Sequence, residues 1–225
     1  MTDRPAVLVI AGTDSSGGAG LARDLATLAD HDVAAMTAIT AITAQTDDAV
    51  TAVHHVPATI ISAQLASAIN RHDLAAIKIG MLGTAQAVEA VVSALSARPD
   101  VPVVLDPVLQ ATSGARLLDH EGIDLLRKRL LPLCRLATPN LPEAATLSEC
   151  VMPTPVQQQA EAILACGAGG VLIKGGHARG EDAVDVLFEA GLPALAITEK
   201  RLDVAMRGTG CTLASAIAGH LARGA

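Results

Sequence analysis

The chain has 225 residues, of which 51% are hydrophobic and 17% charged, and this is long enough for one large α/β domain with a sizeable core. A formal net charge of -7 leaves no basic face for a phosphate backbone. Aromatic residues are nearly absent, with Phe188 alone, which disfavours stacking platforms for nucleic-acid bases. We therefore expect no nucleic-acid partner and a pocket built from aliphatic, methionine and backbone groups.

Four cysteines are scattered along the chain without CxxC spacing and without histidines at metal-finger intervals: Cys134, Cys150, Cys166 and Cys211. This pattern argues against a zinc site or a disulfide framework and indicates a reducing, cytoplasmic location. The apolar run near the N-terminus is too short for a signal peptide or a membrane span, so we expect a buried strand there and no membrane partner.

Short runs rich in Val, Ile and Leu alternate with Ala-rich segments of helical spacing, a pattern typical of βα units around a mostly parallel sheet with helices on both faces. Neither a low-complexity linker nor a repeat divides the chain, so residues 1–225 are expected to form a single domain. The predicted strands are residues 6–11, 33–39, 75–79, 101–105, 135–138 and 171–174, with weaker ones at 184–188 and 194–197.

Polar and glycine residues follow several of these strands, where ligands of open α/β sheets bind. The segment GTDSSGGAG after the first strand matches neither a Walker loop nor GxGxxG, and it is either a close approach to a ligand or a plain turn. Gln45 ends the second strand and can both donate to and accept from a heterocycle. Met81 follows the third strand and Asp106 the fourth, although core packing and helix capping would also explain them.

Two later segments add phosphate and metal chemistry. Asn140 and Glu143 stand three apart in TPNLPEA, where they would face Mg²⁺ through water or form a helix cap. Lys174 ends a strand in IKGGH and is followed by two glycines, an arrangement suited to phosphate oxygens.

The motif RGTGCT, residues 207–212, opens the last predicted helix. Backbone N–H groups of Gly208, Thr209 and Gly210 at its first turn would form an anion site favoured by the helix dipole. The same field is expected to lower the pKa of Cys211, so that its thiol acts as a base toward a substrate hydroxyl. The alternative for Cys211 is a small buried side chain near a helix start.

Eight motifs stand in order over nearly the whole chain: VLVIAGTDSSGGAG, RDLAT, TAITAQ, IKIGMLGT, VVLDPV, TPNLPEA, IKGGH and GTGCTLASA. In this set the chain resembles the ribokinase-like small-molecule kinases, and among them the hydroxymethylpyrimidine/phosphomethylpyrimidine kinases of thiamine biosynthesis. The resemblance implies a three-layer αβα sandwich with a mostly parallel central sheet, and a homodimer. It also implies transfer of the ATP γ-phosphate to 4-amino-5-hydroxymethyl-2-methylpyrimidine and then to its monophosphate.

The resemblance implies a role for each matching position. The residues expected around the pyrimidine are Gly12, Asp24, Gln45 and Met81. Those expected at the ATP phosphates are Asp106, Asn140, Glu143 and Lys174. Mg²⁺ would be bound by Glu143 and Asp106 and, through water, by Asn140. The catalytic group would be Cys211 with the anion site of Gly208, Thr209 and Gly210.

Three departures separate the chain from the family pattern. Thr112 and Ala115 replace a lysine and an acid of the family's AKSGDPLL, and residues 205–207, Ala-Met-Arg, replace an Asn-Thr-His approach to GTGC. Arg207 would substitute for the lost lysine, or the flap is altered. The chain also ends one helix past the motif, so nucleotide affinity is the property expected to suffer most. Two alternatives stay open: a pyridoxal or pyridoxine kinase, and a catalytically weak pyrimidine-binding homologue.

Overall fold

A single sheet organises the computed structural model, which describes residues 4–46, 49–70, 73–111, 114–150, 153–176, 180–202 and 206–225. Within these residues nine strands pair in the order β3-β2-β1-β4-β5-β6-β7-β8-β9. The strands are β1 (Ala6–Asp14), β2 (Ala34–Gln45), β3 (Val50–His55), β4 (Leu74–Ile79), β5 (Val103–Leu105), β6 (Leu136–Ala137), β7 (Gly170–Ile173), β8 (Asp182–Glu189) and β9 (Leu195–Lys200).

The middle of the sheet is parallel and its edges are antiparallel. Strands β2, β1, β4, β5, β6 and β7 pair in parallel, so their carboxyl ends meet along one edge of the molecule. Strand β3 pairs antiparallel with β2 at one side, and β8 and β9 continue the other side as antiparallel strands. The predicted α/β class with a mostly parallel sheet is confirmed.

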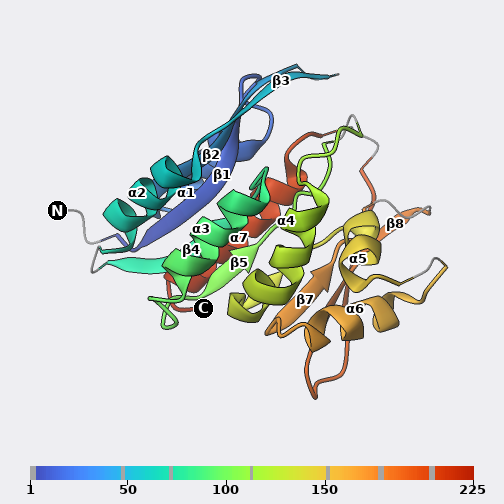
Figure 1. Cartoon of the computed structure of the whole chain (residues 1–225). Helices are drawn as coiled ribbons and strands as arrows, with labels where there is room; N and C mark the ends of the chain where they lie inside the picture. Colours follow the sequence, from blue (N-terminus) through green and yellow to red (C-terminus); the bar gives the residue numbers. More distant parts are fainter. Residues whose placement is uncertain are drawn as a thin grey trace.

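Helices cover both faces of the sheet (Figure 1). They are α1 (Gly20–Asp30), α2 (Ala58–Ile69), α3 (Ala85–Leu95), α4 (His120–Leu125), α5 (Leu141–Ser148), α6 (Val156–Ala165) and α7 (Thr209–Ala222), with a π-helical turn η1 (Leu126–Leu130) and a 3₁₀ turn η2 (Leu131–Leu133) after α4. Helices α1 and α7 pack on one face and the others on the opposite face, which gives the expected three layers. No helix in the described ranges has both the length and the apolar character needed to cross a membrane.

The sheet separates two apolar cores. Alternate residues of β1 point to opposite faces, so that Leu8 and Ile10 pack under α2 and α3 while Val7 and Val9 pack under α1 and α7. A strand covered on both faces is apolar throughout, and this explains why β1 reads as a continuous hydrophobic run. The two cores hold the strand ends, and therefore the site, in fixed positions.

All eight predicted strands are present within a few residues, but β3 was missed and β2 runs to Gln45, beyond its predicted end at residue 39. Both differences concern one arm, in which the end of β2 pairs with β3. Five of the six residues of β3 are exposed, so it lacks the buried alternation by which a strand is recognised in sequence.

Candidate active site

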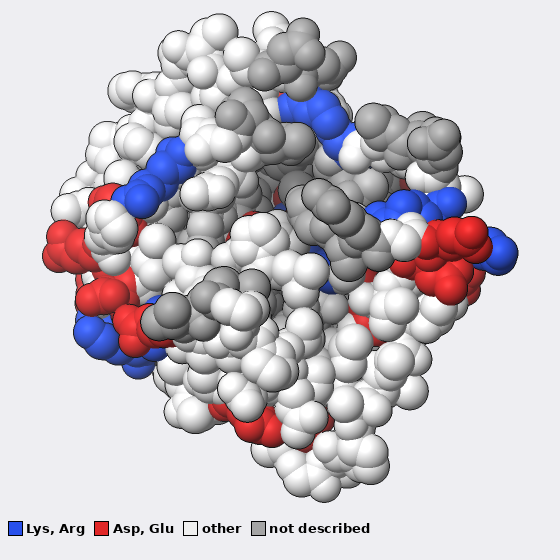
Figure 2. All heavy atoms as spheres, turned by 90° about the vertical axis from the view of Figure 1, so that its right-hand side faces the viewer, with Lys and Arg blue, Asp and Glu red and all other residues white. Residues whose placement is uncertain are grey.

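A cavity of about 950 Å³ opens at the carboxyl ends of the parallel strands. Its wall includes the ends of β1 and β4, the segments after β5 and β7, and the start of α7. Figure 2 shows the face on the right-hand side of Figure 1, where uncharged residues predominate and charged side chains gather near the left and right margins. This volume lies near the upper end of the range of about 300–1,000 Å³ that is typical of small-molecule sites.

The first turn of α7 presents backbone N–H groups to this cavity. Gly208 is the cap, with φ 74° and ψ 11°, and its carbonyl accepts the N–H of Thr212 at 2.8 Å. The N–H groups of Thr209, Gly210 and Cys211 come before this first bond, so they have no carbonyl partner within the helix. An anion placed there would be stabilised by these N–H groups and by the helix dipole. A Cβ at Gly208 would collide with the Gly18 carbonyl oxygen, so this backbone path requires glycine.

Cys211 lies half-buried at the cavity wall. Burial raises the pKa of its thiol, and the negative charges of Asp106 and Asp24 act in the same direction. The Lys78 ammonium group and the backbone N–H of Gly20 oppose them without reversing the shift. The expectation that the helix N-terminus lowers the pKa of Cys211 is wrong, because removal from water outweighs the favourable field.

Lys174 and Asp106 form an ion pair beside the start of α7. The Lys174 Nζ lies 2.9 Å from Asp106 Oδ1, and both side chains are largely buried. Burial alone would lower the pKa of Lys174, but the negative charges of Asp106 and Glu143 raise it above its usual value, so the ammonium group stays charged. A Cβ at Gly210 would lie 3.0 Å from Lys174 Nζ, which places this cation next to the anion site.

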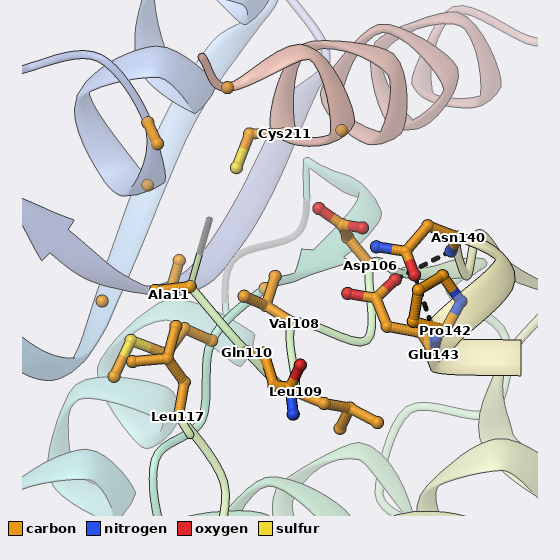
Figure 3. A pocket seen from close by; sticks show the side chains of 18 of the residues that line it. Ala11, Asp106, Val108, Leu109, Gln110, Leu117, Asn140, Pro142, Glu143 and Cys211 are labelled. Carbon is orange, nitrogen blue, oxygen red and sulfur yellow. Dashed lines mark hydrogen bonds between the residues drawn. The ribbon is translucent and has the colours of Figure 1, made fainter. Parts of the chain in front are cut away.

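Asn140 and Glu143 form the capping box of α5. The Asn140 Oδ1 accepts the Glu143 N–H at 2.9 Å, and Glu143 Oε2 accepts the Asn140 N–H at 2.8 Å. The cap interpretation is therefore correct, and it is compatible with a site role because both residues line the cavity. In Figure 3 they lie beside Asp106, with Cys211 on the α7 side of the cavity.

Glu143 carries an unusual protonation equilibrium. Burial, followed by repulsion from Asp106, raises its pKa from 4.5 to about 7, while Lys174 acts in the opposite direction. The carboxyl group therefore holds its proton at pH values at which an exposed glutamate has lost it.

These carboxylates fit a magnesium ion. Mg²⁺ binds oxygen atoms and usually takes one or two protein carboxylates together with water and substrate phosphates. Asp106 and Glu143 place two carboxyl groups on one side of the cavity, and a divalent cation would relieve the repulsion between them.

On the opposite side, Gly12, Gln45 and Met81 also line the cavity. A Cβ at Gly12 would lie 3.0 Å from Met81 Sδ, so only glycine leaves the thioether in place without a shift. Met81 packs with Ala41 and Leu117 in a small apolar cluster. Part of the cavity wall is therefore apolar, and Gln45 adds a polar side chain to the lining.

The structure corrects the expectation that Asp24 contacts the pyrimidine. Its side chain is fully buried behind the cavity wall, where both carboxylate oxygens accept hydrogen bonds from Lys78 Nζ at 2.8 Å. Lys78, which does line the cavity, was missed by the sequence reasoning. The available signal was a charged residue inside the apolar strand LAAIKI, because a buried charge requires a counterion.

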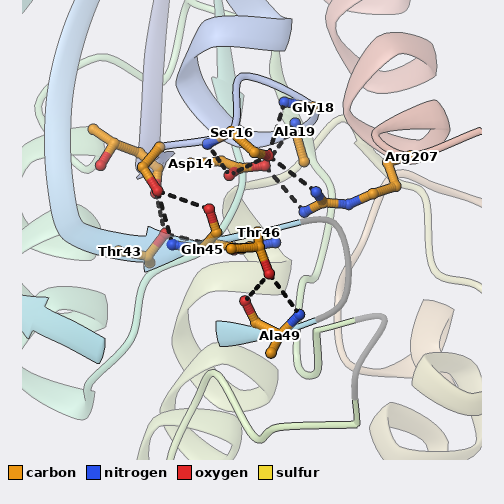
Figure 4. A network of polar contacts seen from close by, with 11 residues as sticks. Asp14, Ser16, Gly18, Ala19, Thr43, Gln45, Thr46, Ala49 and Arg207 are labelled. Atoms are coloured by element: carbon orange, nitrogen blue, oxygen red, sulfur yellow. Dashed lines mark hydrogen bonds and ion pairs between the residues drawn. The ribbon is translucent and has the colours of Figure 1, made fainter. Parts of the chain in front are cut away.

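A second ion pair ties the approach to α7 to the loop after β1 (Figure 4). Arg207 Nη2 lies 3.1 Å from Asp14 Oδ2, and its Nη1 donates to Ser16 Oγ at 2.9 Å. Asp14 also accepts the backbone N–H of Ala19 at 2.9 Å. Arg207 therefore connects the two loops, and it also lines the cavity, so its substitution for the lysine replaced by Thr112 stays a prediction. Thr112 and Ala205 lie outside the described residues.

Comparison with known proteins identifies relatives over almost the whole chain. Residues 14–225 match the family described as phosphomethylpyrimidine kinase. The chain is 44% identical over 224 residues to a hydroxymethylpyrimidine/phosphomethylpyrimidine kinase of Rhizobium meliloti (strain 1021), a match that covers 96% of this chain and 82% of that protein.

Solved structures show the same architecture. A phosphomethylpyrimidine kinase from Clostridium difficile 630 has a TM-score of 0.83 and 36% identity, covering 99% of this chain and 92% of that one. An ADP complex of Bacillus subtilis pyridoxal kinase has a TM-score of 0.89 and 34% identity, covering 99% and 86%. Fold and site thus define a small-molecule kinase of the ribokinase-like fold. Within that class, the chain belongs to the phosphomethylpyrimidine kinase family.

Proposed function

We propose that this kinase transfers the γ-phosphate of ATP to 4-amino-5-hydroxymethyl-2-methylpyrimidine and then to its monophosphate, giving the pyrophosphate used in thiamine biosynthesis. One observation carries the proposal: a single cavity is lined by the apolar residues around Met81, by the charged residues Asp106, Glu143 and Lys174, and by the N-terminus of α7. Cys211 lies in that first turn of α7. Substrate hydroxyl, γ-phosphate and proton acceptor would therefore meet at one place, as phosphoryl transfer requires.

In the first step the hydroxyl oxygen of the pyrimidine attacks the γ-phosphorus, the bond to the β,γ-bridging oxygen breaks, and ADP leaves. The hydroxyl proton passes to Cys211 Sγ in its thiolate form, and Cys211 lines the cavity where the attacked phosphoryl group would lie. The N–H groups of Thr209, Gly210 and Cys211 stabilise charge on the transferred group, and Lys174 neutralises phosphate charge beside them. The phosphate itself is the acceptor in the second step, so the base is less important there.

Asp106 and Glu143 would hold Mg²⁺, with Asn140 acting through a water molecule. Bound Mg²⁺ supplies neutralisation of the ATP phosphates and holds them in a reactive geometry. The capping box fixes Glu143 in place through the Asn140 N–H, and Glu143 lines the cavity.

Gly12, Gln45 and Met81 would bind the pyrimidine. The Gln45 amide offers one donor and one acceptor to ring and amino nitrogens, and Met81 provides an apolar, polarisable contact to the ring. Asp24 has no place in this contact shell, since Lys78 and Ser215 occupy its oxygens.

Pyridoxal phosphorylation is the second candidate, because the Bacillus subtilis pyridoxal kinase shares this fold at a TM-score of 0.89. Pyridoxal is also a heterocyclic alcohol and would meet the same anion site. The higher identity to the Rhizobium meliloti kinase, 44%, favours the pyrimidine. A pyrimidine-binding protein with weak ATP chemistry is the third candidate, motivated by the segment around Thr112.

The proposal extends to location and assembly. The chain is proposed to form one kinase domain and to act in the cytoplasm. There the four free thiols would stay reduced, those of Cys134, Cys150, Cys166 and Cys211. A homodimer is proposed because the antiparallel edge β9 is exposed and presents Leu195 at 57% and Ile197 at 48% exposure. Light scattering after size-exclusion chromatography tests the dimer.

The decisive experiment is product analysis with Mg·ATP and each alcohol separately. Mono- and pyrophosphorylated pyrimidine, with pyridoxal phosphorylated at least about tenfold less efficiently, is the expected result. The opposite preference would establish the pyridoxal kinase. Pyrimidine binding by calorimetry without ADP release would establish the binding protein.

A further inference from the structure

Lys78 occupies an unusual place for a lysine. It stands in β4 on the face covered by α1 and α7, two residues after Ala76, which packs in the apolar core of that face. Its side chain is 0% exposed, and Nζ lies 2.8 Å from each oxygen of Asp24, which is equally buried. Replacing such a pair by apolar residues is often neutral or stabilising, so stability alone does not explain it.

The pair is connected to the helix that carries Cys211. Ser215 Oγ donates to Asp24 Oδ1 at 2.8 Å, and Ser215 follows Cys211 by four residues in α7, on the same face of the helix. Lys78 and Cys211 both line the cavity, while Asp24 and Ser215 lie behind its wall. A Cβ at Gly80 would lie 2.9 Å from Lys78 Nζ, so the chain leaves room for the ammonium group there.

We propose that Lys78 is a positioning residue of the phosphoryl transfer: held by Asp24, to which Ser215 also donates, its ammonium group stabilises the thiolate of Cys211 that accepts the substrate proton. This inference rests on the proposed role of Cys211 as the base. Lys78 itself neither gains nor loses a proton, because the S–H bond forms as the O–H bond of the alcohol breaks.

The charges around the thiol support this assignment. Burial, the largest influence, raises the pKa of Cys211, and the positive charge of Lys78 is the largest influence that lowers it. Asp24 on α1 and Asp106 after β5 favour the neutral thiol, whereas the Gly20 N–H favours the thiolate. Lys174 after β7 is a second cation that senses Cys211, but its Nζ is bound to Asp106. The pKa of Lys78 is raised by Asp24 and Cys211 against the effect of burial, so it stays charged.

The two members of the pair should therefore act on the thiol in opposite directions. Removing the Lys78 charge removes the main influence that lowers the pKa of Cys211, while removing the Asp24 charge removes one of the two carboxylates that raise it. If the pair only stabilised the fold, the two replacements would shift the pKa of Cys211 in the same direction, or would not shift it at all.

Iodoacetamide labelling of Cys211, followed by peptide mass spectrometry as a function of pH, measures this directly. The midpoint of labelling should rise by about one pH unit in Lys78→Met and fall by about one unit in Asp24→Asn. Cys166 in the same samples reports general changes in exposure. Arg4→Gln, which breaks the exposed pair between Arg4 and Asp32, is the control and should leave the midpoint in place.

If Lys78→Met does not fold, the role of Lys78 can still be tested with a double variant. The double variant Asp24→Asn/Lys78→Met contains no unpaired charge, and its midpoint should lie above that of Asp24→Asn by about one unit. Midpoints that coincide in these two proteins would overturn the role of Lys78.

Turnover separates this inference from the proposed function. If Cys211→Ala keeps wild-type ADP release, the thiol is not the base and the proposed function loses its acceptor, whatever the labelling shows. If Cys211→Ala is inactive while the midpoints do not move, only the role of Lys78 fails. The expected result is an inactive Cys211→Ala, shifted midpoints, and at least about tenfold lower kcat in Lys78→Met at neutral pH.

Discussion

Arg207 and Asp14, 193 positions apart in the chain, form an ion pair 3.1 Å long at the edge of the cavity. Arg207 directly precedes the cap of α7, and Asp14 ends β1. The pair therefore connects the proposed anion site to the loop that follows the first strand.

Arg207→Gln should loosen the first turn of α7. A hydrogen-bonded charged pair with exposures of 18% and 3% is worth about 1.5–3 kcal/mol, so kcat/KM is expected to fall by about ten- to a hundredfold. Steady-state kinetics with the pyrimidine measures it, and Arg4→Gln serves as the exposed-pair control. Unchanged kinetics in Arg207→Gln would mean that Asp14 and its backbone contacts hold the loop alone.

Gly208→Ala should damage both folding and catalysis. The added Cβ collides with the Gly18 carbonyl and strains a residue at φ 74°, at an expected cost of about 1–3 kcal/mol in the free energy of unfolding. Gly191→Ala is the matched control, since Gly191 has φ 75° and no neighbour within 4 Å of the added atom. Urea unfolding compares the two, and equal costs would show that the contact with Gly18 is unimportant.

Glu143→Gln should change how stability depends on pH. The folded pKa is raised from 4.5 to about 7, so in that window the folded chain keeps a proton that the unfolded chain has lost. The free energy of unfolding of the wild type therefore falls as pH rises, by on the order of 3 kcal/mol from this group.

The glutamine variant lacks this titration, so its stability relative to the wild type should improve by a similar amount between about pH 5 and about pH 8. Denaturant unfolding at both pH values provides the comparison, with the exposed Glu161→Gln on α6 as control. A difference that stays constant with pH would show that Glu143 ionises normally.

Single replacements in the Lys78 and Asp24 pair should be costly to stability. Removing one partner leaves a buried charge without its counterion, at about 3–5 kcal/mol, whereas the paired change Lys78→Met/Asp24→Leu should recover most of that loss. Urea unfolding of the three variants tests the non-additivity. Additive losses would mean that the two side chains contribute independently.

Much of this fold was predictable because its strands are short apolar runs between glycine and polar punctuation. Strand β1 is apolar on both faces and was found readily. Strand β3 was missed because its residues are largely exposed and its only partner is the end of β2. An exposed antiparallel arm leaves no periodic apolar signal.

The proposed site was predictable to the extent that its residues follow strands or begin helices. Gln45, Asp106 and Lys174 follow that rule and line one cavity. Asp24 lies one turn inside α1, and the lysine inside the apolar strand LAAIKI indicates a buried counterion without indicating that Asp24 is that counterion. The direction of the Cys211 pKa shift likewise depends on burial, which a motif does not reveal.

The most direct test of the account is ADP release with Mg·ATP and 4-amino-5-hydroxymethyl-2-methylpyrimidine by the wild type and by Cys211→Ala. The account predicts pyrimidine-dependent turnover in the wild type and a loss of about a hundredfold or more in the variant, the contribution of a positioned base. Equal turnover in the two proteins would contradict the role of the thiol at the start of α7. No pyrimidine-dependent turnover in the wild type would contradict the kinase assignment itself.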